Sequence, residues 1–203
     1  MRSLAAFLAL PIGLAGFGTT QASAQHVQAR QGFWIGFGLG YGEAIATCAN
    51  CGTATDWGAS GFLKFGGTLG PKTLLGGVAH AWIKSSQGAT EILGNVTGSI
   101  FYYPALATGF FLTGGLGISE YNLGGYAATS AMGWGLRAGV GYDIRVGAMT
   151  SVTPVVDLTY GGGMSPHGKT GWRQAVIDLG VGVTFHWHAT AVSAGVHSFG
   201  QAA

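Results

Sequence analysis

Residues 32–42 read GFWIGFGLGYG, and this stretch decides the fold. Large apolar residues occupy every odd position from Phe33 to Tyr41, and glycine or tryptophan occupies the positions between them. A period of two indicates a β-strand with two unlike faces. Seven further stretches repeat this alternation with turn signals between them. An even number of such strands predicts an all-β fold, an eight-stranded antiparallel up-and-down transmembrane barrel standing in lipid.

The composition points to the same environment. The 203 residues are 48% hydrophobic and only 8% charged, and the mean hydropathy is +0.38. A soluble protein carries roughly a quarter of its residues as charged side chains, so something other than water must cover much of this surface. With Arg2 removed as described below, the formal charge is +1, which provides no strong field to gather nucleic acid or an acidic substrate.

The N-terminus has the features of an export signal. A basic start is followed by an apolar run and by Ala22-Ser23-Ala24, the small residues that a signal peptidase reads. We expect residues 1–24 to be a cleaved signal peptide, with a retained anchor as the alternative. Residues 25–31 then form a periplasmic N-terminal segment, 32–187 the barrel, and 188–203 a C-terminal tail, unless 192–199 provide an alternative last strand.

The expected strands and connections follow from the alternation and from Gly, Pro and Asn signals. In the third strand we place Val78, His80 and Trp82 inward, and the opposite register stays open. Long connections after odd-numbered strands and short turns after even-numbered ones are typical of outer-membrane barrels. The strands are expected at 32–41, 58–69, 73–84, 91–103, 110–118, 131–146, 150–160 and 175–187, and the principal loops at 42–57, 119–130 and 161–172.

Aromatic residues gather near both strand ends, as in the girdles that mark membrane interfaces. A soluble β-sandwich or lipocalin-like barrel would instead turn its apolar face inward and carry more charge. The expected girdle near the long loops is Tyr41, Trp57, Trp134, Tyr160 and Trp172, and the one near the short turns is Phe33, Tyr102, Tyr103, Phe110, Tyr142, Phe185 and Trp187.

Several segments carry a family resemblance: residues 32–42, GFFLTGGLGISE at 109–120, GWGLRAGVGYDIRV at 133–146 and DLGVGVTFHW at 178–187. They resemble the bacterial outer-membrane β-barrel domain family, which is similar to small OmpA-type and OmpX-type barrels and to opacity-type surface antigens. The resemblance implies a fold and a membrane and names no reaction. Such proteins usually end on an aromatic residue, whereas here residues 188–203 follow Trp187.

Four charged residues face inward in the expected registers: Lys64, Arg137, Asp157 and Asp178. Arg137 and Asp157 sit at similar height on adjacent strands. Because an eight-stranded barrel is only wide enough to fill with side chains, charges there must pair or be hydrated. We expect a structural ion-pair network that plugs the lumen, as the resemblance to OmpA-type barrels implies. The alternative is a narrow selective pore.

Cysteine and histidine provide the other candidate sites. Cys48 and Cys51 are the only cysteines of an exported chain, which favours a loop disulfide over a redox or zinc site. His186 and His188 could hold a metal, although a solvated rim is the preferred interpretation. His197 precedes Ser198 in the tail, at the wrong end for a lipid-modifying enzyme, and no nucleophile and base converge elsewhere. We therefore expect no metal, no cofactor and no catalytic residue.

These observations predict a non-enzymatic outer-membrane protein that serves envelope integrity or surface interaction through its extracellular loops. Its expected partners are outer-membrane lipid, lipopolysaccharide and the barrel-insertion machinery, without nucleic acid and without a required oligomer. A porin-like channel for small solutes or ions is the alternative function, and a lipid-modifying outer-membrane enzyme is a weaker one.

Overall fold

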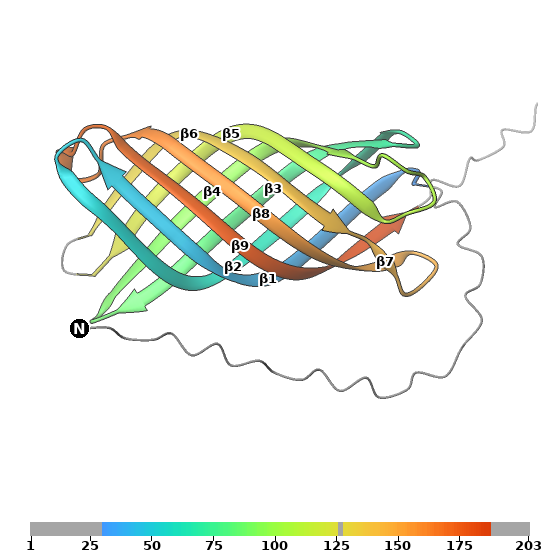
Figure 1. Cartoon of the computed structure of the whole chain (residues 1–203), viewed down its shortest axis with the longest axis horizontal. Coiled ribbons are helices and arrows are strands. Elements are labelled where there is room, and N and C mark those ends of the chain that lie inside the picture. The colour runs from blue at the N-terminus through green and yellow to red at the C-terminus, as the bar shows by residue number, and fades with distance from the viewer. Residues whose placement is uncertain (1–29, 126–127, 188–203) are drawn as a thin grey trace, which may run out of the picture.

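The computed structural model of the chain describes residues 30–125 and 128–187, which form a closed antiparallel barrel with strongly tilted strands (Figure 1). Apart from β6 and β7, consecutive strands pair with each other; β1 also pairs with β9, and the β6–β8 pairing closes the wall. The short β7 pairs with β8 beyond the end of β6, so eight long strands build the barrel and the predicted fold class is confirmed. The elements are β1 (Phe33–Cys48), β2 (Cys51–Gly70), β3 (Thr73–Ser86), β4 (Ala89–Tyr102), β5 (Phe110–Gly124), β6 (Thr129–Tyr142), β7 (Ile144–Arg145), β8 (Thr150–Met164), η1 (Pro166–Gly168) and β9 (Trp172–Trp187).

The two faces of each strand separate as the alternation predicts. On β1, Leu39 is 77% exposed on the outer wall, whereas Trp34 is buried in the bore. On β3, Val78, His80 and Trp82 are all buried, so the inward register is correct for that strand. A wall that is apolar outside and mixed inside reverses the arrangement of a soluble β-protein.

The predicted long loops are wrong, because strands occupy most of them. β1 continues to Cys48 and β2 begins at Cys51, so only Ala49 and Asn50 connect them instead of residues 42–57. The segments 119–130 and 161–172 likewise shrink to connections at 125–128 and 165–171. Main-chain groups make the ladder hydrogen bonds, and small or polar side chains such as Ala44 and Ala46 do not prevent them.

The expected asymmetry of loop lengths disappears with this correction. We call the end that carries the β1–β2 turn, where Cys48 and Cys51 are bonded, the disulfide end. The opposite end carries the β2–β3 turn with Pro71, and we call it the Pro71 end. The connection at 165–171 on the disulfide end and the one at 103–109 on the Pro71 end both contain seven residues. β2 has 20 residues, whereas a membrane-spanning strand needs about 9–11. The long strands therefore carry the barrel past the hydrocarbon layer.

Two aromatic residues leave the predicted girdles. Trp172 and Tyr103 are both buried inside the barrel, whereas Trp57 and Tyr41 stack on the outer wall with ring centroids 6.0 Å apart. The stretch 92–119, which contains no charged residue, lies in β4, the following connection and β5. Within the described residues, no helix has the length and hydropathy to span a bilayer.

Several predictions concern parts of the chain outside the described residues. These are the signal peptide at 1–24, most of the N-terminal segment 25–31, and the tail 188–203 with His188, His197, Ser198 and the alternative last strand. Of the N-terminal segment, Arg30 and Gln31 are described, and Arg30 is buried.

Candidate functional site in the barrel interior

Glycines on the inner face of β1 make room for side chains from β2. A Cβ at Gly38 would lie 2.5 Å from the Phe62 ring, and a Cβ at Gly36 would lie 2.7 Å from Lys64 Cε. Phe62 and Lys64 therefore lie across β1, and any larger residue there would collide with them. The inward glycines therefore make room for side chains in a filled bore. They lie within a strand, so they do not form a glycine-rich phosphate-binding loop.

The interior is layered, with an apolar cluster at each end and polar residues between them. The cluster at the Pro71 end consists of Trp34, Leu74, Val78, Phe101, Tyr103 and Phe111. The cluster at the disulfide end consists of Ala44, Trp82, Leu93, Tyr121, Met164, Trp172 and Val176. Phe111 and Trp82 are fully buried, so bulky rings cross the bore at both ends.

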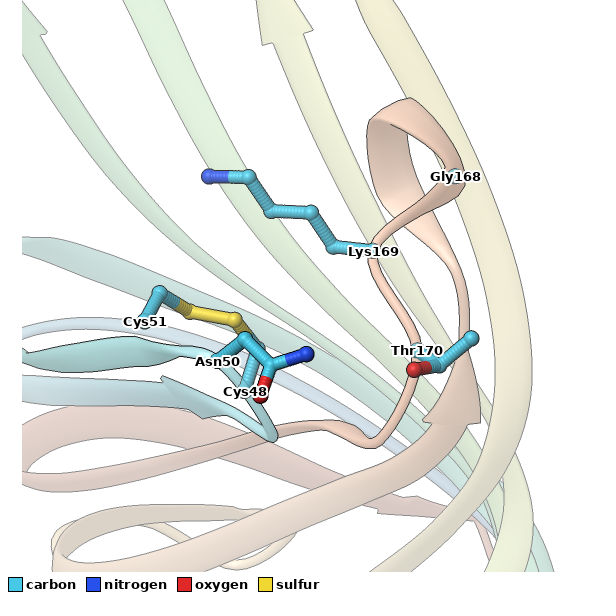
Figure 2. A pocket seen from close by; sticks show the side chains of 6 residues that line it. All are labelled: Cys48, Asn50, Cys51, Gly168, Lys169 and Thr170. Atoms are coloured by element: carbon cyan, nitrogen blue, oxygen red, sulfur yellow. A yellow bond between two sulfur atoms is a disulfide. The ribbon is translucent and has the colours of Figure 1, made fainter.

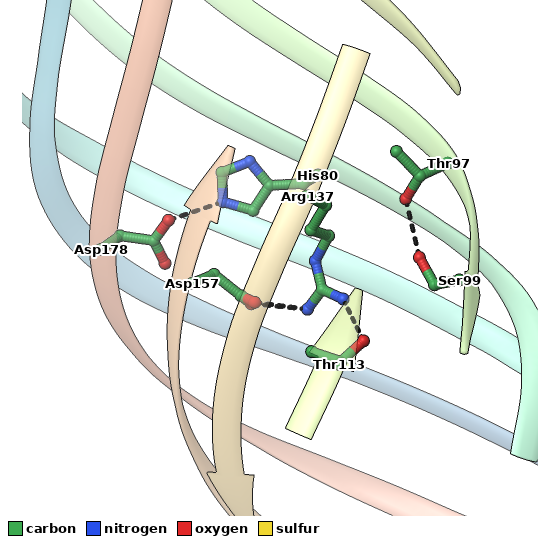
Figure 3. Close-up of polar contacts among 7 residues, drawn as sticks. All are labelled: His80, Thr97, Ser99, Thr113, Arg137, Asp157 and Asp178. Atoms are coloured by element: carbon green, nitrogen blue, oxygen red, sulfur yellow. Dashed lines mark hydrogen bonds and ion pairs between the residues drawn. The ribbon is translucent and has the colours of Figure 1, made fainter. Parts of the chain in front are cut away.

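Arg137 and Asp157 form a buried ion pair in the polar layer (Figure 3). Arg137 Nη2 lies 2.6 Å from Asp157 Oδ1 and donates to Asp157 Oδ2 at 2.7 Å, while Nη1 donates to the Thr113 hydroxyl at 3.1 Å. Both charged side chains are at least 95% buried. The contact comes from β6 and β8, the adjacent strands on which the alternation places these residues.

Asp178 pairs across the lumen with a residue that the sequence reasoning did not select. Its Oδ2 lies 2.8 Å from His80 Nε2, and both side chains are buried (Figure 3). Asp178 is also the register partner of Asp157 on β8, so two buried carboxylates stand side by side, each with its own basic partner. The inward position of His80 was a usable signal, but the sequence did not show that β3 faces β9.

Lys64 belongs to neither pair. Its ammonium lies 5.7 Å from the Phe101 ring centroid and 5.4 Å from that of Phe111, and among the described residues it makes no ion pair. The four predicted charges thus share the bore as one Arg–Asp pair, one His–Asp pair and a lysine held over aromatic rings. They do not form the single network expected of them.

A third inward carboxylate, Asp143, was missed as a site residue although the alternation placed it inward. It accepts hydrogen bonds from the hydroxyls of Tyr103 and Thr153, both at 2.7 Å. Burial, with Asp143 alongside, raises the pKa of Tyr103 well above its usual value, so the phenol stays a neutral donor. The Arg30 guanidinium covers the Tyr103 ring at 3.6 Å, which closes the bore at the Pro71 end.

His186 is also buried, so the expectation of a solvated rim is wrong for this residue. It lies on the inner face of β9, and its main-chain N–H donates to the Met149 carbonyl at 2.8 Å. Among the described residues no group of three or more His, Cys, Asp or Glu side chains is placed to hold a metal ion.

At the disulfide end, Cys48 and Cys51 are joined across the two-residue turn between β1 and β2 (Figure 2). The Ala49 N–H donates to the Thr170 carbonyl at 3.2 Å, which ties this turn to the connection between η1 and β9. A shallow pocket of about 320 Å³ lies between the two segments, with the Lys169 side chain extending above the disulfide. The sequence placed the cysteines in a wide loop, and the structure places them at the tip of a hairpin.

Comparison with known proteins establishes the class of fold. No protein-family model matches the chain, and no curated protein matches it in sequence. Among solved structures, Neisserial surface protein A is similar with a TM-score of 0.52 and 15% identity over 76% of this chain and 97% of that one. Ail, the attachment invasion locus protein of Yersinia pestis, is similar with a TM-score of 0.52 and 11% identity, over 76% of this chain and 99% of that one. At these identities the likeness shows the fold alone.

The chain therefore has the fold of small eight-stranded outer-membrane β-barrels, as the resemblance in its segments led us to expect.

Proposed function

We propose that this protein is a non-enzymatic barrel of a Gram-negative outer membrane, exported by a cleaved signal peptide, which supports envelope integrity and surface interaction. The observation that carries the proposal is the contrast between its two surfaces. Outside, Leu39, Leu116 and Leu179 are each at least 64% exposed on a continuous apolar wall. Exposing such a surface to water is unfavourable in free energy, whereas the acyl chains of outer-membrane lipid and lipopolysaccharide would cover it in an apolar environment.

The filled interior favours a structural role over conduction. Aromatic clusters cross the bore at both ends, and two buried ion pairs lie between them. An eight-stranded barrel has just enough room for side chains of this size. A continuous water path would require the rings of Phe101 and Phe111 at one end, and those of Trp82 and Trp172 at the other, to move aside.

Surface interaction is proposed for the disulfide end. The strands extend there beyond the span that a bilayer requires, and the disulfide fastens the tip of the β1–β2 hairpin. Paired hairpins, in place of the longer loops first expected, then present the binding surface. The two similar structures are named as a surface protein and as an attachment invasion locus protein, which is compatible with such a role.

Planar-bilayer conductance tests the filled lumen. We expect purified wild-type protein to give no discrete channel steps, because both apolar clusters block the bore. The matched variant Phe101→Ala/Phe111→Ala removes two rings from the Pro71 end alone and should also give no discrete steps, because the cluster at the disulfide end still crosses the bore. Discrete steps from the wild-type protein would contradict the proposal and support the porin-like alternative.

Lipid mass spectrometry tests the absence of enzymatic activity. Outer-membrane lipids from cells that express the protein should show the same acyl composition as those from cells that express an unrelated barrel. A protein-dependent gain or loss of an acyl chain would refute the non-enzymatic assignment.

A further inference from the structure

A small cavity lies within the mouth of the barrel at the disulfide end. Its volume is about 150 Å³, less than the roughly 300 Å³ at which pockets for drug-sized ligands begin. It therefore has room for a small headgroup only. It is lined by Ala44, Ala46, Ala54, Asp56, Trp82, Glu91, Leu93, Tyr121 and Trp172.

Three aromatic side chains form much of the cavity wall. The Tyr121 and Trp172 rings meet edge to face with centroids 4.7 Å apart, and Trp82 is fully buried beneath the mouth. The indole N–H of Trp82 donates to the Gly42 carbonyl at 3.1 Å, and that of Trp172 donates to Gln174 Oε1 at 3.3 Å. Trp82 therefore packs under the cavity, whereas Trp172 and Tyr121 keep a small exposed ring surface that a ligand can contact. Because the Trp172 N–H is already engaged, its indole offers this surface and no hydrogen-bond donor.

The charged residues that line the cavity are both acidic. Asp56 and Glu91 line it together with the Tyr121 side chain. The nearby cation is Lys84, whose ammonium forms an ion pair with Asp56. Since one lysine offsets one of the two carboxylates, the cavity mouth keeps a formal surplus of one negative charge.

We propose that this cavity binds a small organic ammonium ion. The electron-rich faces of Trp and Tyr attract a cation directly, and a methylated ammonium gives up its weak hydration easily to such walls. A compact divalent metal would need several oxygen ligands, which aromatic walls cannot supply. A neutral apolar ligand would bury the Glu91 carboxylate without bringing a positive charge to pair with it.

This proposal goes beyond the structural role given above, and its test does not depend on that role. The wild-type protein in maltoside micelles is titrated with choline and with 3,3-dimethylbutan-1-ol, the neutral carbon isostere of choline. Saturation-transfer NMR and calorimetry report binding, and phosphocholine detergents are avoided because their headgroups belong to the same ligand class. We expect choline to bind about tenfold more tightly than its neutral isostere.

Variants assign the binding to this cavity. Tyr121→Leu should remove most of the preference for choline, and Glu91→Gln should weaken choline binding several-fold without affecting the isostere. Trp57→Leu is the matched control, because Trp57 lies on the outer wall and its loss should leave binding unchanged. Circular dichroism confirms that each variant is folded.

Three results would overturn the proposal. The first is equal binding of choline and its isostere to the wild-type protein, which would make the cavity merely apolar. The second is no choline binding to that protein. The third is a choline affinity that survives Glu91→Gln and Tyr121→Leu but falls in Trp57→Leu, which would place the ligand on the outer wall. Because the first two results need only the wild-type protein, a variant that fails to fold leaves the test intact.

Discussion

Replacing Arg137 with alanine should destabilise the barrel strongly, because it removes one partner of a buried ion pair. Arg137 provides the ion-pair partner that the structure gives Asp157, and it also donates to Thr113. Asp157 is fully buried, and its register partner on β9 is a second carboxylate, Asp178. Arg137→Ala therefore leaves a buried negative charge beside another buried carboxylate.

The expected cost follows from this geometry. Removing one partner of a buried ion pair costs about 3–5 kcal/mol, because the remaining charge loses its compensation but stays desolvated. The two short contacts to Asp157 and the close second carboxylate argue against a value below that range. With a urea dependence of about 2 kcal/mol per M, this loss lowers the unfolding midpoint by roughly 1.5–2.5 M.

The assay is equilibrium urea unfolding of the protein in lipid vesicles, followed by tryptophan fluorescence. Arg173→Ala is the control, since Arg173 is exposed on β9 and its loss should change stability by no more than about 0.5 kcal/mol. The double variant Arg137→Leu/Asp157→Leu should recover most of the lost stability, because it removes both charges together. An unchanged midpoint for Arg137→Ala would refute the reasoning that the buried pair stabilises the barrel.

Two further perturbations test the filled bore and the hairpin tip. Gly38→Val should collide with Phe62 and cost about 1–3 kcal/mol, whereas Gly67→Ala, which meets open space, should be nearly neutral; heat-dependent gel mobility distinguishes the two, and equal mobility would argue against a crowded bore. The double variant Cys48→Ser/Cys51→Ser should lose at most about 2 kcal/mol in urea unfolding, because the disulfide closes a very short loop, and complete failure to fold would contradict a peripheral role.

The alternation predicted the fold because the face on which a strand residue lies is set by its position along that strand alone. The side chains of successive residues must point to opposite faces, so lipid on one side and a narrow bore on the other leave a direct record in the sequence. Leu39 and Trp34 on β1, and the buried set on β3, lie on the faces expected of them. The inward positions of Lys64, Arg137 and Asp178 follow from the same rule.

The ends of the strands could not be predicted in this way. Beyond the bilayer, side chains no longer have to be apolar on the outer face, so the pattern weakens while main-chain pairing continues. Residues 42–48 and 51–57 therefore resemble a loop in sequence and form a paired hairpin in the structure. Trp172 and Tyr103 were misplaced for a related reason, since an aromatic residue near a strand end suits either an interface or a plug.

The sequence by itself determined a barrel with a lipid-facing wall and an ionised bore, because sidedness is a property of neighbouring residues along one strand. Only the tertiary structure decided which charges meet. Asp178 reaches His80, 98 residues away, because closure of the sheet sets β9 across from β3, and it leaves Lys64 over two aromatic rings. Contacts across the lumen depend on barrel circumference and stagger, which no single strand encodes.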